Sequence, residues 1–212
     1  MNAGATTRNL IAPLLRWGYR LRVHGAHRCP RRGPLLIVAP HRGFLDATVI
    51  ATCLPRPVEV LVDPGGVSAL GGQVPGRIVV DPDDPGPGLR EALTVLQGGG
   101  AVGAWVGEGH ERGAGLLIAR TGATVLPVFV LGGSGRHPGD PPRWRARIDV
   151  VVGEPWSVRA PADPLSRADV LSTAEVIRQR VVDHATHAGR RLGADDGVGV
   201  PGPQDSPDNG SL

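Results

Sequence analysis

The strongest constraint on this chain is an alternation between short, continuously apolar runs and segments with helical periodicity, which extends from Pro34 to Gly153. Continuous apolar runs of this length are typical of strands buried on both faces, and the helical segments between them are typical of crossover connections. The pattern predicts an α/β fold with a mixed, largely parallel sheet flanked by helices. Strands are expected at 35–39, 58–62, 77–80, 101–106, 124–132 and 145–153, and helices at 44–54, 88–97, 115–121 and 166–192.

Residues 6–22 combine apolar and basic side chains at helical spacing, which predicts an amphipathic helix. Two interpretations remain open. The helix lies in a membrane interface, with Trp17 and Tyr19 at headgroup depth and arginines on lipid phosphate, or it only covers the core of the domain. Pro13 falls inside the segment and disfavours a regular helix there. The basic members are Arg8, Arg16, Arg20 and Arg22, and the apolar ones are Leu10, Ile11, Leu14, Leu15, Trp17 and Leu21.

The length of 212 residues corresponds to one domain with additional terminal segments. We expect an N-terminal amphipathic helix within residues 1–24 and the main domain at residues 25–192. Residues 193–212 contain four Asp, no basic residue and little that a core could bury, so a disordered acidic tail is expected there. No apolar window approaches the ~18 residues that span a bilayer, and no secretory signal pattern precedes the domain.

The charge is unevenly distributed. The chain carries a net charge of +3, yet residues 1–60 hold nine Arg against Asp46 and Glu59, a local net charge of +7. A basic segment of this kind attracts polyanions, of which anionic lipid headgroups and nucleic acids are the common ones. Aromatic residues make up only 3% of the chain, which leaves few platforms for base stacking, so no nucleic-acid partner is expected.

Several chemistries are excluded by residue type. The chain has no Lys, which excludes a lysine-containing phosphate loop and a lysine Schiff base. Its two cysteines, Cys29 and Cys53, do not make a disulfide framework, and a cytoplasmic location is expected. The histidine pairs 24/27 and 184/187 lack an acidic or Cys ligand to complete a set, so neither a metal nor another cofactor is expected.

A histidine and an aspartate follow the first apolar strand, in the segment His41-Arg42-Gly43-Phe44-Leu45-Asp46. In open α/β sheets, ligands bind at the carboxyl ends of the strands. Asp46 falls in the first turn of the following helix, where the helix dipole favours a carboxylate. Such a carboxylate can orient an imidazole that acts as general base toward a substrate hydroxyl. The alternative is a helix-capping aspartate beside an incidental histidine.

The order of the surrounding segments resembles the lysophosphatidic acid acyltransferase family of glycerolipid acyltransferases, over about residues 20–160. The resemblance implies that His41 is the general base and Asp46 its orienting partner, both catalytic. It also implies a fatty acyl donor in the form of a coenzyme A or acyl-carrier-protein thioester and a lipid acceptor. The four blocks that carry it are GPLLIVAPHRGFLDATVIA (33–51), GRIVVD (76–81), VGEGH (106–110) and GAGLLIARTGATVLPV (113–128).

This chain departs from the family at the positions of two phosphate-binding arginines. The second block ends in Asp81-Pro82 where the family has Asp-Arg, and Glu111 stands where the third block has Arg. Arginines at shifted positions are candidates for that role, and they are equally compatible with solvated surface side chains. Further departures are Pro40, Gly107 and His110. The expected substrate-binding residues are Arg42, Arg77, Glu108, Gly109 and Arg112.

These observations lead to one expectation and one competing class. The protein is expected to be an O-acyltransferase that moves a fatty acyl group to a lysophospholipid or related lipid hydroxyl, peripheral on the inner face of the membrane through residues 6–22. The departures from the family pattern motivate the alternative, a non-catalytic lipid-binding or scaffold protein with the same fold.

Overall fold

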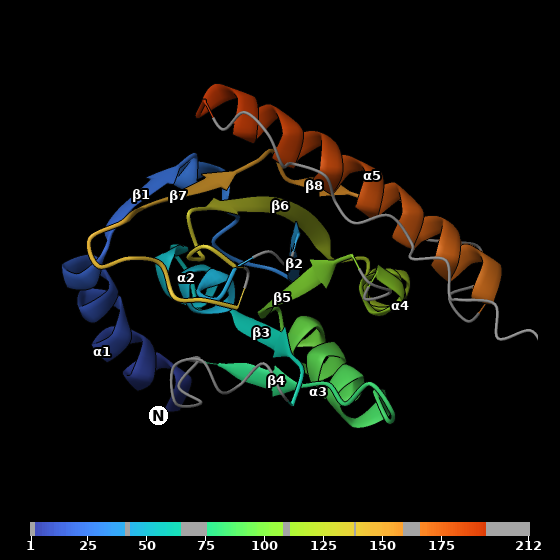
Figure 1. Cartoon of the computed structure of the whole chain (residues 1–212). Coiled ribbons are helices and arrows are strands. Elements are labelled where there is room, and N and C mark those ends of the chain that lie inside the picture. Colours follow the sequence, from blue (N-terminus) through green and yellow to red (C-terminus); the bar gives the residue numbers. More distant parts are fainter. Residues whose placement is uncertain are drawn as a thin grey trace, which may run out of the picture.

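One sheet organises the computed structural model, which describes residues 3–40, 43–64, 76–107, 111–137, 139–158 and 166–193. Within these residues the strand order is β1-β7-β6-β2-β5-β3-β4, and β8 pairs with β6 (Figure 1). The five strands β6, β2, β5, β3 and β4 are parallel to one another. Strand β7 is antiparallel to β6, and β1 is parallel to β7. The bounds are β1 Arg20–His24, β2 Leu35–Pro40, β3 Glu59–Val62, β4 Arg77–Val79, β5 Ala101–Val106, β6 Thr124–Leu131, β7 Arg147–Val152 and β8 Trp156–Ser157.

Helices cover both faces of this sheet. Side chains of α1 and α2 pack in the hydrophobic cluster on one face, and side chains of α3, α4 and α5 pack in the cluster on the other. The predicted mixed, largely parallel sheet flanked by helices is therefore confirmed. The bounds are α1 Ala3–Gly18, α2 Asp46–Cys53, α3 Gly86–Gln97, α4 Glu111–Thr121 and α5 Arg167–Arg191, with a short 3-10 turn at Ala26–Arg28.

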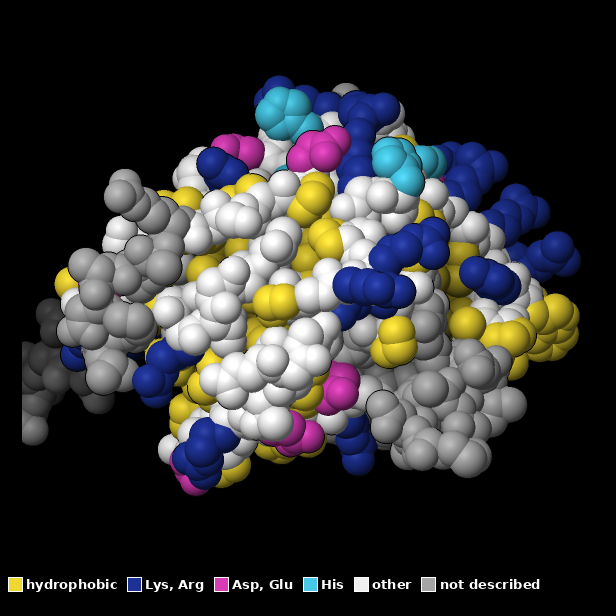
Figure 2. Space-filling view, turned by 180° about the vertical axis from the view of Figure 1, so that it is seen from behind, with side chains coloured by type: hydrophobic (Ala, Val, Ile, Leu, Met, Phe, Trp, Pro, Cys, Tyr) yellow, Lys and Arg dark blue, Asp and Glu magenta, His cyan; other side chains and the backbone are white. Residues whose placement is uncertain are grey.

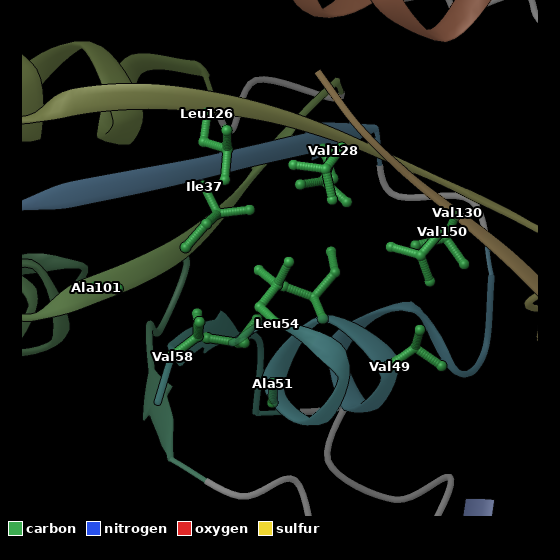
Figure 3. Close-up of a cluster of buried hydrophobic side chains, with 14 of the residues drawn as sticks. Ile37, Val49, Ala51, Leu54, Val58, Ala101, Leu126, Val128, Val130 and Val150 are labelled. Carbon is green, nitrogen blue, oxygen red and sulfur yellow. The ribbon is translucent and has the colours of Figure 1, made fainter. Parts of the chain in front are cut away.

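Strand β2 lies at the centre of the sheet and is buried along its whole length. Its side chains alternate between the two clusters: Leu35 and Ile37 face α2, whereas Leu36 and Val38 face α3, α4 and α5. Figure 3 shows the first cluster, with Ile37 among the side chains between the sheet and α2. A strand that must fill two apolar layers has no polar position, which explains its continuous apolar sequence.

The N-terminal region differs from the prediction. Residues 6–22 were expected as one helix, but α1 ends at Gly18 and residues Arg20–His24 form the edge strand β1. The alternation Arg20-Leu21-Arg22-Val23 has the two-residue period of a strand. Leu21 and Val23 pack against the core cluster, so Arg20 and Arg22 belong to the opposite face of the sheet from α1. Only the helical part of the segment carries the predicted amphipathic pattern.

The other boundaries lie close to expectation. Strand β5 has the predicted bounds, and β2, β3, β4, β6 and β7 differ from theirs by two residues at most. Helix α4 begins at Glu111, four residues earlier than predicted, and α5 spans almost the whole predicted segment. Of the predicted acidic tail, only Gly193 lies within the described residues. In the described part of the chain, no helix is both long and apolar enough to cross a membrane.

A buried arginine fixes the amino-terminal edge of the sheet. The guanidinium of Arg56 donates to the carbonyl oxygens of Pro30 at 3.2 Å, Gly33 at 2.9 Å and Gly99 at 2.7 Å. These carbonyls belong to the turns that lead into β2 and β5. Burial of a charge without polar partners has a high free-energy cost. The three carbonyl groups offset this cost for the guanidinium of Arg56.

Candidate active site

The carboxyl ends of β6, β2, β5, β3 and β4 meet at one edge of the sheet because these strands are parallel. Strands β2 and β5, which precede the two candidate motifs, are neighbours in the sheet. Residues Leu35–Pro40 of β2 pair directly with Ala101–Val106 of β5. This is the edge at which ligands bind in open α/β sheets.

Asp46 lies at this edge and is 2% exposed. It is the first residue of α2, and its Oδ2 accepts the backbone N–H of Gly43 at 2.7 Å. The N–H of Leu45 donates to the carbonyl oxygen of Gly133, which ties the start of α2 to the segment after β6. The helix N-terminus and the N–H donor both favour the charged carboxylate. The structure thus places Asp46 as a fixed anion between the ends of β2 and β6.

Two glycines leave room for this carboxylate. A Cβ atom added to Gly43 would lie 2.6 Å from Oδ1 of Asp46, and one added to Gly133 would lie closer still. Any side chain at either position would collide with the carboxylate. Sequence reasoning missed Gly133, whose only signal is a pair of glycines directly after an apolar strand.

Four of the predicted site residues, His41, Arg42, Glu108 and Gly109, lie outside the described residues. Gly107 is the last described residue before Glu108. Its φ is +119°, a backbone conformation that favours glycine. The chain therefore leaves β5 through a turn that only glycine adopts readily.

A cleft of about 620 Å³ opens beside these strand ends. Its wall is formed by the ends of β3 and β5, by the segment after β4, and by α3, α4 and α5. The indole N–H of Trp105 donates to the carbonyl oxygen of Leu61 at 2.7 Å and closes one side of the cleft. This volume is in the range of small-molecule sites. Apolar lining residues include Leu61, Val80, Leu89, Leu116 and Val170, and the charged lining residues are Arg112 and Asp63.

The two predicted arginines that the structure describes have different surroundings. Arg112 lies in the first turn of α4 and lines the cleft. Arg77 is exposed at the start of β4, and the residues that line the cleft from this part of the chain are Val80, Pro82 and Pro85. The structure therefore brings Arg112, but not Arg77, to the cleft.

A second histidine–aspartate pair, which sequence reasoning missed, lies on the outer face of β1 and β7. Nε2 of His24 is 2.7 Å from Oδ1 of Asp149, and Arg147 donates to both carboxylate oxygens. Burial alone would raise the pKa of Asp149, but the hydrogen bonds from Arg147 and His24 hold it below its ordinary value. The two residues lie on adjacent strands at the side of the sheet, so we interpret the pair as an ion pair that joins β1 and β7.

The remaining candidate groups give no metal site or nucleophile. Among the described residues, no three His, Cys, Asp or Glu side chains are grouped so that they could hold a metal ion. Cys29 is buried, and this burial raises the pKa of its thiol, which disfavours the reactive thiolate.

Comparison with solved structures finds the same fold in the 1-acyl-sn-glycerophosphate (LPA) acyltransferase PlsC from Thermotoga maritima. The TM-score is 0.55 and the sequence identity 16%, and the match covers 87% of this chain and 83% of that protein. No family model matches the sequence, and no curated protein matches it. The similarity therefore shows a shared fold at a distance where sequence comparison fails.

Proposed function

We propose that the protein is an O-acyltransferase that moves a fatty acyl group from a thioester of coenzyme A or acyl-carrier protein to the hydroxyl group of a lysophospholipid or a related lipid. The observation that carries the proposal is the buried carboxylate of Asp46, fixed at the strand edge immediately beyond the position where the sequence places His41. The fold shared with an LPA acyltransferase supports the same class of reaction.

In this proposal His41 is the general base and Asp46 orients it. The imidazole takes the proton of the lipid hydroxyl, and the oxygen attacks the thioester carbonyl to form the new C–O bond. The tetrahedral intermediate then collapses, the C–S bond breaks, and the imidazolium returns its proton to the departing thiolate. The charge of Asp46 stabilises the imidazolium in between, as the carboxylate of a catalytic triad does.

The apolar cleft gives the acyl chain a place to bind. Leu61, Leu89 and Leu116 contribute apolar surface, so burial of methylene groups there is favourable by about 0.8 kcal/mol each. Arg112 is the only arginine among the cleft-lining residues of the described chain, and it provides a cation for phosphate on the donor or the acceptor. The cleft therefore fits a ligand that is apolar along most of its length and carries polar groups that Arg112 and Asp63 can bind.

The role of His41 is tested by thiol release from an acyl thioester in the presence of a panel of lysolipids and neutral lipid alcohols, with mass analysis of the products. We expect His41→Ala to lower turnover by about 10²–10⁴-fold, the contribution of a positioned base. The control is His137→Ala, an exposed histidine in the connection between β6 and β7. Wild-type turnover in a folded His41→Ala protein would contradict the assignment.

The role of the cleft is tested by narrowing it with Leu89→Trp. We expect the rate with long-chain thioesters to fall well below the rate with short-chain thioesters, because the indole fills the apolar volume. Leu171→Trp, on an exposed position of α5, is the matched control. An equal effect of Leu89→Trp on all chain lengths would show that the acyl chain binds elsewhere.

A non-catalytic lipid-binding protein is the second candidate, and the segment after β4 favours it. Asp81 stands at the end of the second block, and its Oδ1 accepts the backbone N–H of Asp83 at 2.9 Å, so this turn presents acidic groups where the family pattern has an arginine. The same assay separates the two candidates. A protein that binds lysolipid but releases no thiol from any donor of the panel belongs to the second class.

A further inference from the structure

Basic side chains gather on one face of the edge pair β1 and β7. Leu21 and Val23 of β1 pack against the core cluster that includes side chains of α1, so the residues between them lie on the opposite face of the sheet. Ile148 of β7 belongs to the same cluster, and its neighbour Arg147 therefore lies on that opposite face too. Figure 2, seen from behind, shows dark-blue and cyan side chains together at the upper right, the part of the molecule that carries β1 and β7 in Figure 1. We call the exposed basic residues of these two strands the arginine face: Arg20, Arg22, His24 and Arg147.

The arginine face has more positive than negative charge. The pairing of β1 with β7 sets Arg20 directly beside Arg147 and Arg22 beside Asp149. Neighbouring strands lie about 4.8 Å apart, and like charges placed side by side at that distance destabilise a sheet. The carboxylate of Asp149 is buried and accepts hydrogen bonds from Arg147 and His24. Among the described residues, Arg20 and Arg22 make no hydrogen bond or ion pair, so an anionic partner would relieve the repulsion on this face.

The other end of the sheet has the opposite charge. Strand β4 lies at the far edge from β1 in the strand order. Residues 58–97, which include β3, β4 and α3, contain six carboxylates and two arginines, a net charge of −4. The molecule is therefore electrically polar across the sheet. Such a charge distribution steers an anionic partner to the end that carries β1 and β7.

The arginine face begins at the edge of the sheet that holds Asp46. Strand β7 is antiparallel to β6 and β1 is parallel to β7, so both begin where β6 ends. A Cβ atom on Gly132 would collide with the carbonyl oxygen of Arg147, and the next residue, Gly133, packs against the carboxylate of Asp46. In the strand order, β6 and β2 separate the arginine face from the cleft at the ends of β5 and β3. Asp46 therefore lies between the arginine face and the cleft.

A thioester donor has two chemically different ends, and these two features match one each. The acyl chain is apolar and matches the cleft, whose lining includes Leu61, Leu89 and Leu116. The carrier on the other side of the sulfur is anionic, through phosphate groups in coenzyme A and through acidic side chains in a carrier protein. When the acyl chain lies in the cleft and the thioester carbonyl lies beside Asp46, the carrier extends toward β7 and β1.

We propose that the arginine face binds an acidic acyl-carrier protein, which presents its thioester to the candidate site. This inference rests on the proposed acyl transfer and names the donor for it. Coenzyme A matches the face less well, because its adenine gains from a ring to stack on, and Arg20–His24 and Arg147–Val152 contain no aromatic residue. A protein with several carboxylates matches a broad, exposed face of two strands by charge complementarity.

The experiment compares three donors of the same acyl group in the thiol-release assay with the full chain. They are the thioesters of acyl-carrier protein, of coenzyme A and of N-acetylcysteamine, which has no phosphate. We expect Arg20→Glu with Arg22→Glu to raise KM for the carrier-protein thioester about tenfold or more, because reversed charges at an exposed surface weaken association. The kcat with this donor, and both constants with the N-acetylcysteamine thioester, should stay within about twofold of wild type.

The matched control is Arg31→Glu with Arg32→Glu, which changes the net charge by the same amount. Both arginines are exposed in the turn before β2, at the opposite edge of the sheet, and KM for the carrier-protein thioester should remain within about twofold of wild type. Thermal melting establishes that each variant is folded. If the Arg20 and Arg22 variant does not fold, the salt dependence of the wild-type protein takes its place, because KM should rise steeply with salt for the carrier-protein thioester and not for the N-acetylcysteamine thioester.

Four results would overturn the inference. Equal losses in the two arginine pairs would mean that only net charge matters. An equal loss with the N-acetylcysteamine thioester would mean that β1 supports the site and does not bind the carrier. A larger loss with the coenzyme A thioester would identify coenzyme A as the occupant. A stable dimer that Arg20→Glu with Arg22→Glu converts to monomer would show that the acidic end of a second copy covers the face.

The inference and the proposed acyl transfer fail in different ways. If no donor releases thiol with any acceptor of the panel, the acyl transfer is contradicted. The arginine face is then tested by titration of the chain with unacylated carrier protein. Binding that Arg20→Glu with Arg22→Glu weakens, and Arg31→Glu with Arg32→Glu does not, would support the face as a carrier-protein surface. No binding to the wild-type chain would overturn it.

Discussion

Gly133→Ala tests whether the fold holds the carboxylate of Asp46 as tightly as the geometry indicates. The added methyl group would overlap with Oδ1 of Asp46 and would also lie 3.4 Å from Cγ1 of Val130. Both neighbours are buried, so relief requires a shift of the carboxylate or of the segment after β6. Forced overpacking of this kind costs about 1–3 kcal/mol. For a domain of this size that corresponds to a loss of about 2–12 °C in melting temperature.

The same substitution is expected to lower turnover about 10²-fold, because a displacement of about 1 Å in an orienting group has effects of that order. Melting followed by circular dichroism and the thiol-release assay measure the two effects separately. Gly139→Ala, in the same connection between β6 and β7, is the control, since a Cβ atom there meets nothing within 4 Å. If Gly133→Ala melts and turns over like Gly139→Ala, the carboxylate is not confined as described, and the argument for Asp46 as a fixed anion is refuted.

Two further predictions concern stability. Arg56→Met leaves three partly buried carbonyl groups without their cation, and we expect urea unfolding to show a loss of about 1.5–3 kcal/mol. Arg120→Met, at an exposed position, should change stability little, and equal effects of the two substitutions would contradict the role of Arg56. His184 donates from Nε2 to the carbonyl oxygen of Val151, and its burial lowers its pKa below the ordinary value of about 6.5. The unfolded chain therefore takes up this proton more readily, so stability should fall as the pH drops below about 6.5. His184→Gln should reduce this loss of stability at low pH, whereas His187→Gln, at an exposed position, should not. A larger effect of His187→Gln would show that His184 is not the group responsible.

The central strands could be predicted from the sequence because burial on both faces leaves one consistent signal. β2 and β5 are apolar at every position. Each has only six residues, so neither shows the alternation of apolar and polar faces that would predict a helix. β1 was missed because Arg20–His24 follows a helix directly, and five residues that alternate basic and apolar side chains fit either period. Only the pairing with β7 decides between the two structures.

The start of α4 was missed for a related reason. Gly113 disfavours helix by propensity, and the helix was predicted to begin only at Gly115. In the structure a Cβ atom on Gly115 would lie 2.5 Å from the carbonyl oxygen of Val170 in α5. This glycine is thus required by the close packing of α4 and α5, a reason that no local pattern shows.

At the candidate site, Asp46 and Arg112 were predicted from the sequence as site residues, whereas the groups that surround them were not predicted. The position of Asp46 follows from local order, because strand, turn and helix are contiguous. Gly133 lies 87 residues further along the chain than Asp46, and Trp144, later in the same connection between β6 and β7, meets Trp17 on α1. No local sequence pattern marks such residues. They can be assigned to the site only when the order of the strands in the sheet is known.

The pairing of β1 with β7 has a consequence for the way the chain is made. Residues Arg20–His24 find their partners in Arg147–Val151, more than 120 residues later, so the edge strand cannot be added until most of the polypeptide has left the ribosome. Until then the nascent chain carries an unpaired basic strand behind α1. The contact between the rings of Trp17 and Trp144 also has to wait, because Trp144 lies only three residues before β7. The final position of α1 against the connection between β6 and β7 is therefore set only once the sheet is complete.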